Sequence, residues 1–270
     1  MKTPHILSAL CLAALLGVAA SCDNIAESDR LVYVKPADVK KNILIEDFTG
    51  QTCRNCPETT DIIHQLQQTY GDSAVIAVGI YSGPFGKRTN GALLPLTTKD
   101  GDEYYTATGI QQQPSVFVDR LTITSDNSVL TNLVNSTISN EARALLSATP
   151  VYDAATGKAS VKVSVESLSD VQNALFNVWV IEDSIVSPQI MPTGKTNTSY
   201  LHNHVFRTHL TAPMEGETAT LTKGQPVSRT YDVTVDASAW KADRLSYVIF
   251  VCDDLGVMQV IKTPVVPKKG

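Results

Sequence analysis

Two cysteines three positions apart, Cys53 and Cys56 in the stretch QTCRNCPETT, are the side chains of this sequence best suited to chemistry. Such a pair can be a dithiol that exchanges with other disulfides, half of a zinc site, or a static structural disulfide. A structural zinc site would need two further nitrogen or sulfur ligands. The compartment of the protein and the elements around the pair decide among these three possibilities.

The first 22 residues indicate export. MKTPH carries one positive charge, the run ILSALCLAALLGVAA at 6–20 is almost entirely apolar, and small residues follow. The run is shorter than the roughly 20 apolar residues of a membrane-spanning helix, so it predicts a signal peptide. Its ending Ala-Ser-Cys resembles the lipobox of bacterial lipoproteins, which implies removal of residues 1–21 and a lipid anchor on Cys22. Ordinary cleavage near Ala20, leaving a free thiol, is the alternative.

Composition and charge narrow the classes of function. The net charge of −5 argues against a nucleic-acid partner, and 43% hydrophobic with 18% charged residues is ordinary for globular domains. The sequence contains no glycine-rich phosphate loop, serine nucleophile elbow or paired acid motif, so we expect no cofactor. Outside the cytoplasm thiols can stay oxidised, so a disulfide between Cys53 and Cys56 is the expected resting state.

Strands and helices alternate in the first half of the chain, which is typical of an α/β sheet layer. Apolar runs and helical spacing predict strands at 42–48, 74–81 and 114–119, and helices at 58–70, 99–109 and 128–146. The cysteines fall between the first strand and the first helix. A helix N-terminus presents free N–H groups and positive dipole, which stabilise a thiolate. Cys53 is therefore the predicted nucleophile, and Cys56 is predicted to resolve the mixed disulfide.

The pattern changes near Thr149. The alternating stretches KASVKVSVESL and SRTYDVTVD, and two apolar stretches at 245–254 and 256–265, predict short antiparallel strands, and no helix is predicted among them. We therefore expect a domain boundary at about 147–150. Residues 148–270 are predicted to form an antiparallel, immunoglobulin-like β-sandwich.

The first half of the chain resembles the thioredoxin superfamily. The resemblance rests on the strand NILIEDF, the motif CRNC at the start of a helix, and the proline of GIQQQPSVFVD. It implies a thioredoxin-like domain at 40–147, preceded by a lipid-anchored tether at 22–39. Two departures from the family are the dipeptide Arg-Asn where Gly-Pro is commonest, and Thr52 where a tryptophan is usual.

The same resemblance assigns roles to residues beside the cysteines. Pro114 would be in cis and would face the dithiol, and Gln113 would pair with a bound peptide strand. Asp47, six residues before the first cysteine, would be a buried carboxylate that shuttles a proton to the second. Glu46 is the rival for this role, because strand alternation alone does not decide which of the two points inward.

Taken whole, the chain resembles outer-membrane lipoproteins of the 28-kilodalton type, through IEDFTGQTCRNCP near the start and YLHNHVFR at 200–207. The resemblance implies a place in the outer membrane of the cell envelope more firmly than a reaction. Our first hypothesis is thiol–disulfide exchange on exported proteins by a lipid-anchored protein. The alternative is a surface interaction protein in which Cys53–Cys56 is structural and the β-sandwich binds a partner.

Three histidines and Cys252, in the second half of the chain, give weaker evidence of chemistry than the cysteine pair. His202 and His204 would share one face of a regular strand, whereas His209 would point to the other, so a hydrogen-bonded network is favoured over a metal site. We therefore expect no metal ion. Cys252, between Val251 and Asp253, is predicted to be a small buried apolar residue.

Overall fold

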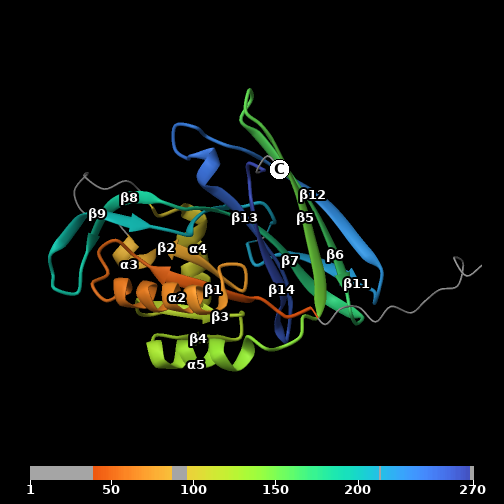
Figure 1. The fold of residues 1–270 in the computed structure, drawn as a ribbon, viewed down its shortest axis with the longest axis horizontal. Coiled ribbons are helices and arrows are strands. Elements are labelled where there is room, and N and C mark those ends of the chain that lie inside the picture. The colour runs from red at the N-terminus through yellow and green to blue at the C-terminus, as the bar shows by residue number, and fades with distance from the viewer. Residues whose placement is uncertain (1–38, 87–95, 213, 268–270) are drawn as a thin grey trace, which may run out of the picture. The chain divides into compact units, whose positions relative to one another are not determined.

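A mixed β-sheet that joins both halves of the chain dominates the fold (Figure 1). The structure is a computed structural model that describes residues 39–86, 96–212 and 214–267, all of which belong to one unit. The signal peptide, Cys22 and nearly all of the tether lie outside the described residues. No described helix is long and apolar enough to cross a bilayer.

The large sheet has nine strands within the described residues. In sheet order they are β14 (Gly256–Pro264), β13 (Leu245–Asp253), β7 (Val171–Glu182), β10 (Val205–His209), β2 (Val75–Tyr81), β1 (Ile43–Thr49), β3 (Ser115–Val118) and β4 (Thr122–Thr124), with β11 (Glu217–Leu221) paired to β7. A second sheet has the order β12 (Pro226–Thr234), β6 (Lys158–Ser167) and β5 (Ala144–Asp153). The hairpin β8 (Ile185–Ile190) and β9 (Thr196–His202) stands apart from both.

The helices lie mainly in the first half of the chain. They are α2 (Cys56–Tyr70), the single turn α3 (Gly83–Gly86), α4 (Lys99–Thr108), α5 (Asn127–Thr137) and the short 3-10 helix η2 (Ala242–Arg244). Helix α5 is shorter than the predicted helix at 128–146. Its N-terminus is capped by Asp126, whereas residues from Ala144 onward pair with β6 and form β5 instead. The pairing of these residues with a distant strand overrides their helical spacing.

The predicted division into a thioredoxin-like α/β domain and a separate β-sandwich is wrong. Strand β10 pairs in parallel with β2 and antiparallel with β7, so strands from both halves form one sheet. At the junction the N–H of Gly79 donates to the carbonyl of His204 at 2.7 Å. Periodicity along a sequence predicts individual strands, but it does not reveal which strands pair across more than 100 residues. The β-rich character predicted for the second half is confirmed.

Three large apolar clusters pack against the faces of the large sheet. Both faces of β1 and β2 are buried, which accounts for their continuous apolar runs. Helices α2 and α5 cover one face, with Ile63 and Leu130 packed on Ile45. On the other face Trp179, fully buried, meets the rings of Phe206 and Phe250 at 5.2 Å between centroids. The third cluster fills the space between the second sheet and the β7–β13 end of the large sheet.

Candidate functional site

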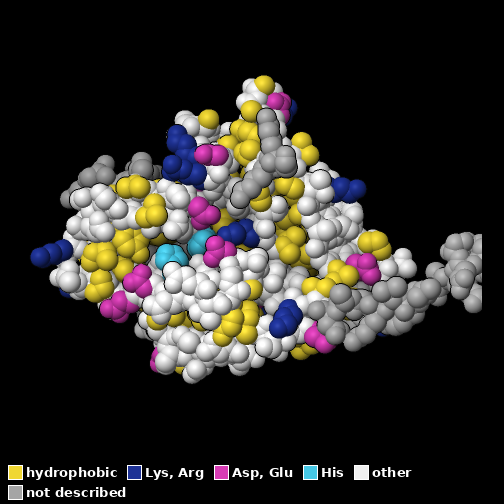
Figure 2. All heavy atoms as spheres, in the orientation of Figure 1, with side chains coloured by type: hydrophobic (Ala, Val, Ile, Leu, Met, Phe, Trp, Pro, Cys, Tyr) yellow, Lys and Arg dark blue, Asp and Glu magenta, His cyan; other side chains and the backbone are white. Residues whose placement is uncertain are grey.

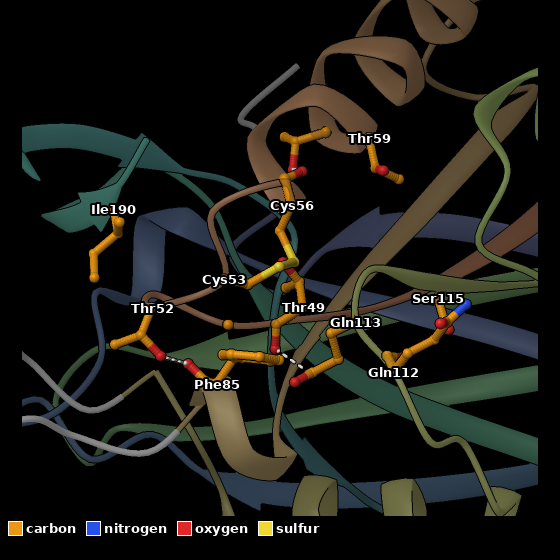
Figure 3. The surroundings of a disulfide bond; sticks show 12 residues. Thr49, Thr52, Cys53, Cys56, Thr59, Phe85, Gln112, Gln113, Ser115 and Ile190 are labelled. Atoms are coloured by element: carbon orange, nitrogen blue, oxygen red, sulfur yellow. Dashed lines mark hydrogen bonds between the residues drawn. A yellow bond between two sulfur atoms is a disulfide. The ribbon is translucent and has the colours of Figure 1, made fainter. Parts of the chain in front are cut away.

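Cys53 and Cys56 are joined in a disulfide with a Cα–Cα distance of 5.4 Å. Cys56 is the first residue of α2, and Pro57 follows at a position where a helix N–H has no partner. Cys53 lies in the preceding turn, where its N–H donates to the carbonyl of Gly50 at 3.0 Å. Figure 3 shows the two sulfur atoms between the start of α2 and the segment that carries Gln113.

The disulfide is closed off from solvent. Cys53 is 2% exposed and Cys56 is 1% exposed. Figure 3 shows Ile190, at the end of β8, on one side of the disulfide loop. A thiolate attacks a disulfide along the sulfur–sulfur axis, so access to the sulfur limits the rate of exchange. In this conformation the pair is enclosed, and exchange would require local opening.

Hydrogen bonds from hairpin β8–β9 hold the disulfide loop. The Nε2 amide of Gln189, itself buried, donates to the carbonyls of Gly50 at 3.2 Å and Cys53 at 3.0 Å. From the loop, the Nε2 amide of Gln51 donates to the Ser187 hydroxyl at 2.8 Å. Buried polar groups that are all paired in this way hold their partners in one arrangement. No motif marks either glutamine, and sequence reasoning missed both.

Gln113 and Pro114 lie beside the loop, and the peptide bond between them is cis. The Nε2 amide of Gln113 donates to the carbonyls of Thr49 and Ser82, both at 2.9 Å. These contacts fix the Gln113 side chain to the ends of β1 and β2 (Figure 3). The pairing of Gln113 with a peptide stays a prediction. Thr52, where a tryptophan was the commoner residue, donates its hydroxyl to the carbonyl of Phe85 at 2.8 Å.

Glu46 and Asp47 point to opposite faces of β1. The Oε1 atom of Glu46 accepts from the hydroxyl of Tyr104 at 2.9 Å and lies 3.3 Å from Nε of Arg120. Asp47 faces the side covered by α2, and its Oδ1 atom is buried without a hydrogen-bond partner. Burial raises the pKa of Asp47 to about 7. Of the two rivals, Asp47 is therefore the one on the side of the helix that begins with Cys56.

Asp47 lines a cavity of only about 20 Å³, together with side chains of α2 and β9. His202 of β9 is held there on both ring nitrogens. Its Nδ1 atom is 2.7 Å from the hydroxyl of Tyr81, and its Nε2 atom is 3.1 Å from the carbonyl of Ser187. Burial lowers the pKa of His202 to about 4, so the ring is neutral at physiological pH. A cavity of this size holds no substrate side chain.

The three histidines of the second half do not converge. His204 has a positive φ of 58°, which breaks the chain between β9 and β10, and its Nδ1 atom is 2.9 Å from a carboxylate oxygen of Asp183. His209 lies in β10 with its Nε2 atom 3.5 Å from a carboxylate oxygen of Asp100. Among the described residues, no three His, Cys, Asp or Glu side chains are close enough together to hold a metal ion.

Cys252 is a free thiol with only 3% of its surface exposed. Burial raises the pKa of its thiol, and Arg120 opposes that shift through a contact of 3.8 Å. Arg120 in turn lies over the rings of Tyr104, Trp179 and Phe250. These contacts make Cys252 part of the core, and sequence reasoning gave no sign of the buried arginine beside it.

Comparison with known proteins decides the family. The sequence model described as outer membrane protein Omp28 matches residues 101–269, which is more than half of the chain. The chain belongs to the Omp28 family. It is a protein of the outer membrane in the cell envelope, and the predicted location is confirmed. No curated protein matches the chain.

Two solved structures with TM-scores above 0.5 share the fold. HBP35 of Porphyromonas gingivalis is similar over 86% of this Omp28-family chain and 78% of its own length, with 15% identity and a TM-score of 0.67. An Agrobacterium tumefaciens protein solved by a structural genomics consortium covers 87% of this chain and 98% of its own, with 14% identity and a TM-score of 0.53. A domain of the outer membrane lipoprotein Omp28 from Porphyromonas gingivalis is 20% identical over 47% of this chain and 92% of its own, with a TM-score of 0.34. The likeness to HBP35 extends across both predicted domains, in agreement with a single shared sheet.

Proposed function

We propose that this Omp28-family chain is a lipid-anchored outer-membrane protein that acts by non-covalent binding, and that Cys53–Cys56 is a structural crosslink. The observation that carries this proposal is the burial of both cysteines, in a loop that hairpin β8–β9 holds through Gln189. A cysteine that exchanges disulfides needs an accessible sulfur. The proposed anchor is a lipid on Cys22, which the resemblance of Ala-Ser-Cys to a lipobox implies.

As a crosslink, the disulfide fixes the turn on which the hairpin docks. It closes a loop of only a few residues, which stabilises a folded chain by about 2 kcal/mol in the chain-entropy picture. The carbonyls of Gly50 and Cys53 then stay where Gln189 can reach them. The role of the disulfide is to keep loop and hairpin together, so that the protein presents one rigid surface to a partner.

The test pairs stability with exchange activity in the full-length protein in detergent. Replacing both cysteines (Cys53→Ser with Cys56→Ser) should lower the midpoint of thermal unfolding by about 5 °C, the shift that about 2 kcal/mol produces in a chain of this size. Neither the wild type nor the variant should accelerate the reduction of insulin. The matched control is Cys252→Ala, which keeps the disulfide. Wild-type acceleration of insulin reduction that the double variant loses would overturn the proposal.

Thiol–disulfide exchange on exported proteins is the second candidate, and the buried Asp47 favours it. A carboxyl with a pKa of about 7 beneath α2 can accept and release a proton at neutral pH. In the reduced protein, the Cys53 thiolate would attack a substrate disulfide and release one substrate thiolate. Cys56, giving its proton to Asp47, would then attack Cys53 and release the second, leaving Cys53–Cys56 oxidised.

Exchange of this kind requires hairpin β8–β9 to move. The variant Gln189→Ala removes the donor that holds the hairpin on the loop, so under this second candidate it should accelerate insulin reduction above the wild type. Under the first candidate the variant changes stability and leaves insulin reduction at the uncatalysed rate.

A further inference from the structure

A cleft of about 620 Å³ opens near the start of β8, away from the disulfide loop. The turn before β13 contributes Trp240, Lys241 and Arg244 to its walls, and β8 and β10 contribute Val186 and Arg207. Its volume lies within the range of about 300–1,000 Å³ found for small-molecule sites. All of these residues are in the described part of the chain, and no motif in the sequence pointed to them.

The cleft carries a surplus of positive charge. Its one carboxylate, Glu182, is buried and already engaged, since it accepts from Nε of Arg207 at 2.7 Å and from the backbone N–H of Lys241 at 3.0 Å. Lys241 and Arg244 are exposed, and neither forms an ion pair with a described residue. One guanidinium nitrogen of Arg244, Nη1, donates to the carbonyl of Ser184 at 2.7 Å, which leaves its other N–H groups for a ligand. Figure 2 shows Lys and Arg side chains gathered over the turn that leads into β13, with one acidic side chain beside them. This surplus stands out on a chain whose net charge is −5.

Apolar surface lies beside these cations. Val186 is 55% exposed, and the ring of Trp240 is half-buried. The turn that carries Trp240 is held in place, because its backbone N–H donates to the carbonyl of Asp236 at 2.8 Å, and the Asp236 carboxylate accepts from Ser238. An aromatic ring beside exposed cationic groups offers a flat surface and a charge-assisted hydrogen bond at the same site.

We propose that this cleft binds a small organic anion, in which a carboxylate or phosphate group meets Lys241 and Arg244 while a flat ring packs on Trp240 and Val186. Sugar acids, sugar phosphates and aromatic acids share this chemistry. The inference rests on the proposed function in one respect, that the chain acts by binding. It is independent of the role of the disulfide, so its failure would leave the insulin result unchanged.

The experiment is a ligand-detected NMR titration of the full-length protein in detergent. Glucuronate and glucose 6-phosphate test the sugar arm, with glucose as their neutral counterpart. The aromatic arm uses 4-hydroxybenzoate, with 4-hydroxybenzamide as its neutral counterpart. We expect at least one anion to saturate the protein below about 10 mM, and to bind about tenfold more tightly than its neutral counterpart. The arm that binds identifies the source of the ligand.

Variants assign the binding to the cleft. Replacing its two exposed cations (Lys241→Gln with Arg244→Gln) should weaken the anion about tenfold, and so should Trp240→Ala. The matched control replaces two exposed lysines outside the cleft (Lys195→Gln with Lys223→Gln) and should leave affinity unchanged. The proposal is overturned if no anion saturates the protein, if neutral counterparts bind equally well, or if the control weakens binding as much as the cleft variant.

Discussion

The disulfide loop and the Trp240 cleft both lie against strand β8, yet they are built in opposite ways. In the loop, buried amides of Gln51 and Gln189 are hydrogen-bonded across to their neighbours, and both sulfur atoms are covered. In the cleft, Lys241 and Arg244 are exposed and have no acidic partner among the described residues. Under the proposed function, the two cysteines with recognisable chemical spacing serve as structure, whereas the exposed cleft that would bind a ligand carries no motif.

Asp47→Asn, in the buried cavity under α2, should raise the free energy of unfolding more than any other variant, by an amount that depends on pH. The pKa of Asp47 is raised from 3.8 to about 7, so the unfolded chain loses this proton first and stability falls as pH rises from about 4 to 7. Asparagine does not ionise, so the variant does not lose stability in this way as the pH rises. At pH 8 the variant should gain up to about 4 kcal/mol in unfolding free energy, and at pH 4 almost nothing. Urea unfolding at the two pH values measures it. An equal gain at both would show that Asp47 is not held protonated.

His202, which lines the same cavity as Asp47, should make stability depend on pH in the opposite direction. The pKa of His202 is lowered from 6.5 to about 4, so the unfolded chain binds this proton first and stability falls as pH drops from 6.5 towards 4. The loss in the wild type should reach about 3 kcal/mol at pH 4. His202→Gln should flatten this slope in urea unfolding, whereas the control His209→Gln, outside the cavity, should retain it. A wild-type slope in the His202 variant would contradict the burial of the ring.

Removing a hydrogen-bond donor from the disulfide loop should have a smaller effect on stability. Gln189→Ala removes the side-chain donor to the carbonyl of Cys53 and one of the two donors to the carbonyl of Gly50, which should lower the unfolding free energy by about 2 kcal/mol. Thermal unfolding measures the change. The matched control is Gln172→Ala, in an exposed position of β7, which should change stability by less than about 0.5 kcal/mol. Equal effects of the two variants would remove the distinction between a sealed loop and ordinary surface.

We expect the smallest change in stability from a substitution in the Trp240 cleft. Lys241→Gln removes the charge of an exposed side chain that has no ion pair among the described residues. It should therefore change the unfolding free energy by less than about 0.5 kcal/mol. Urea unfolding at pH 7 is the measurement. A loss of about 2 kcal/mol would mean that the cleft residues hold the fold together as the disulfide loop does, and the comparison between the two regions would fail.

Much of the local structure could be predicted from the sequence. The apolar runs of β1 and β2 indicated strands buried on both faces, and Gly109 indicated where α4 ends. The overall fold was predicted wrongly, because it depends on the pairing of β10 with β2. That junction rests on one register position, Val205 opposite Gly79, and nothing local in either strand encodes it.

Of the candidate site, the Cys53–Cys56 disulfide could be predicted from the sequence, but its burial could not. The spacing of Cys53 and Cys56 indicated that they could pair, and the structure joins them. The loop that carries them is held by Gln189 and Ser187, which are distant in sequence and are residue types common in exposed loops. Accessibility of a sulfur atom is set by tertiary contacts, so the spacing of two cysteines does not distinguish a working dithiol from a crosslink.

The rate at which Cys53–Cys56 is reduced in the folded protein shows whether the fold encloses the disulfide. The measurement is the mass gained by the Cys53–Cys56 peptide when dithiothreitol and iodoacetamide are added together, at pH 8 and without denaturant. We predict that the folded protein reacts about a hundredfold more slowly than the chain in denaturant, which corresponds to a local opening free energy of about 3 kcal/mol, and that Gln189→Ala narrows this gap. Equal rates for the folded and the denatured chain would show that the disulfide is open to attack in the folded protein.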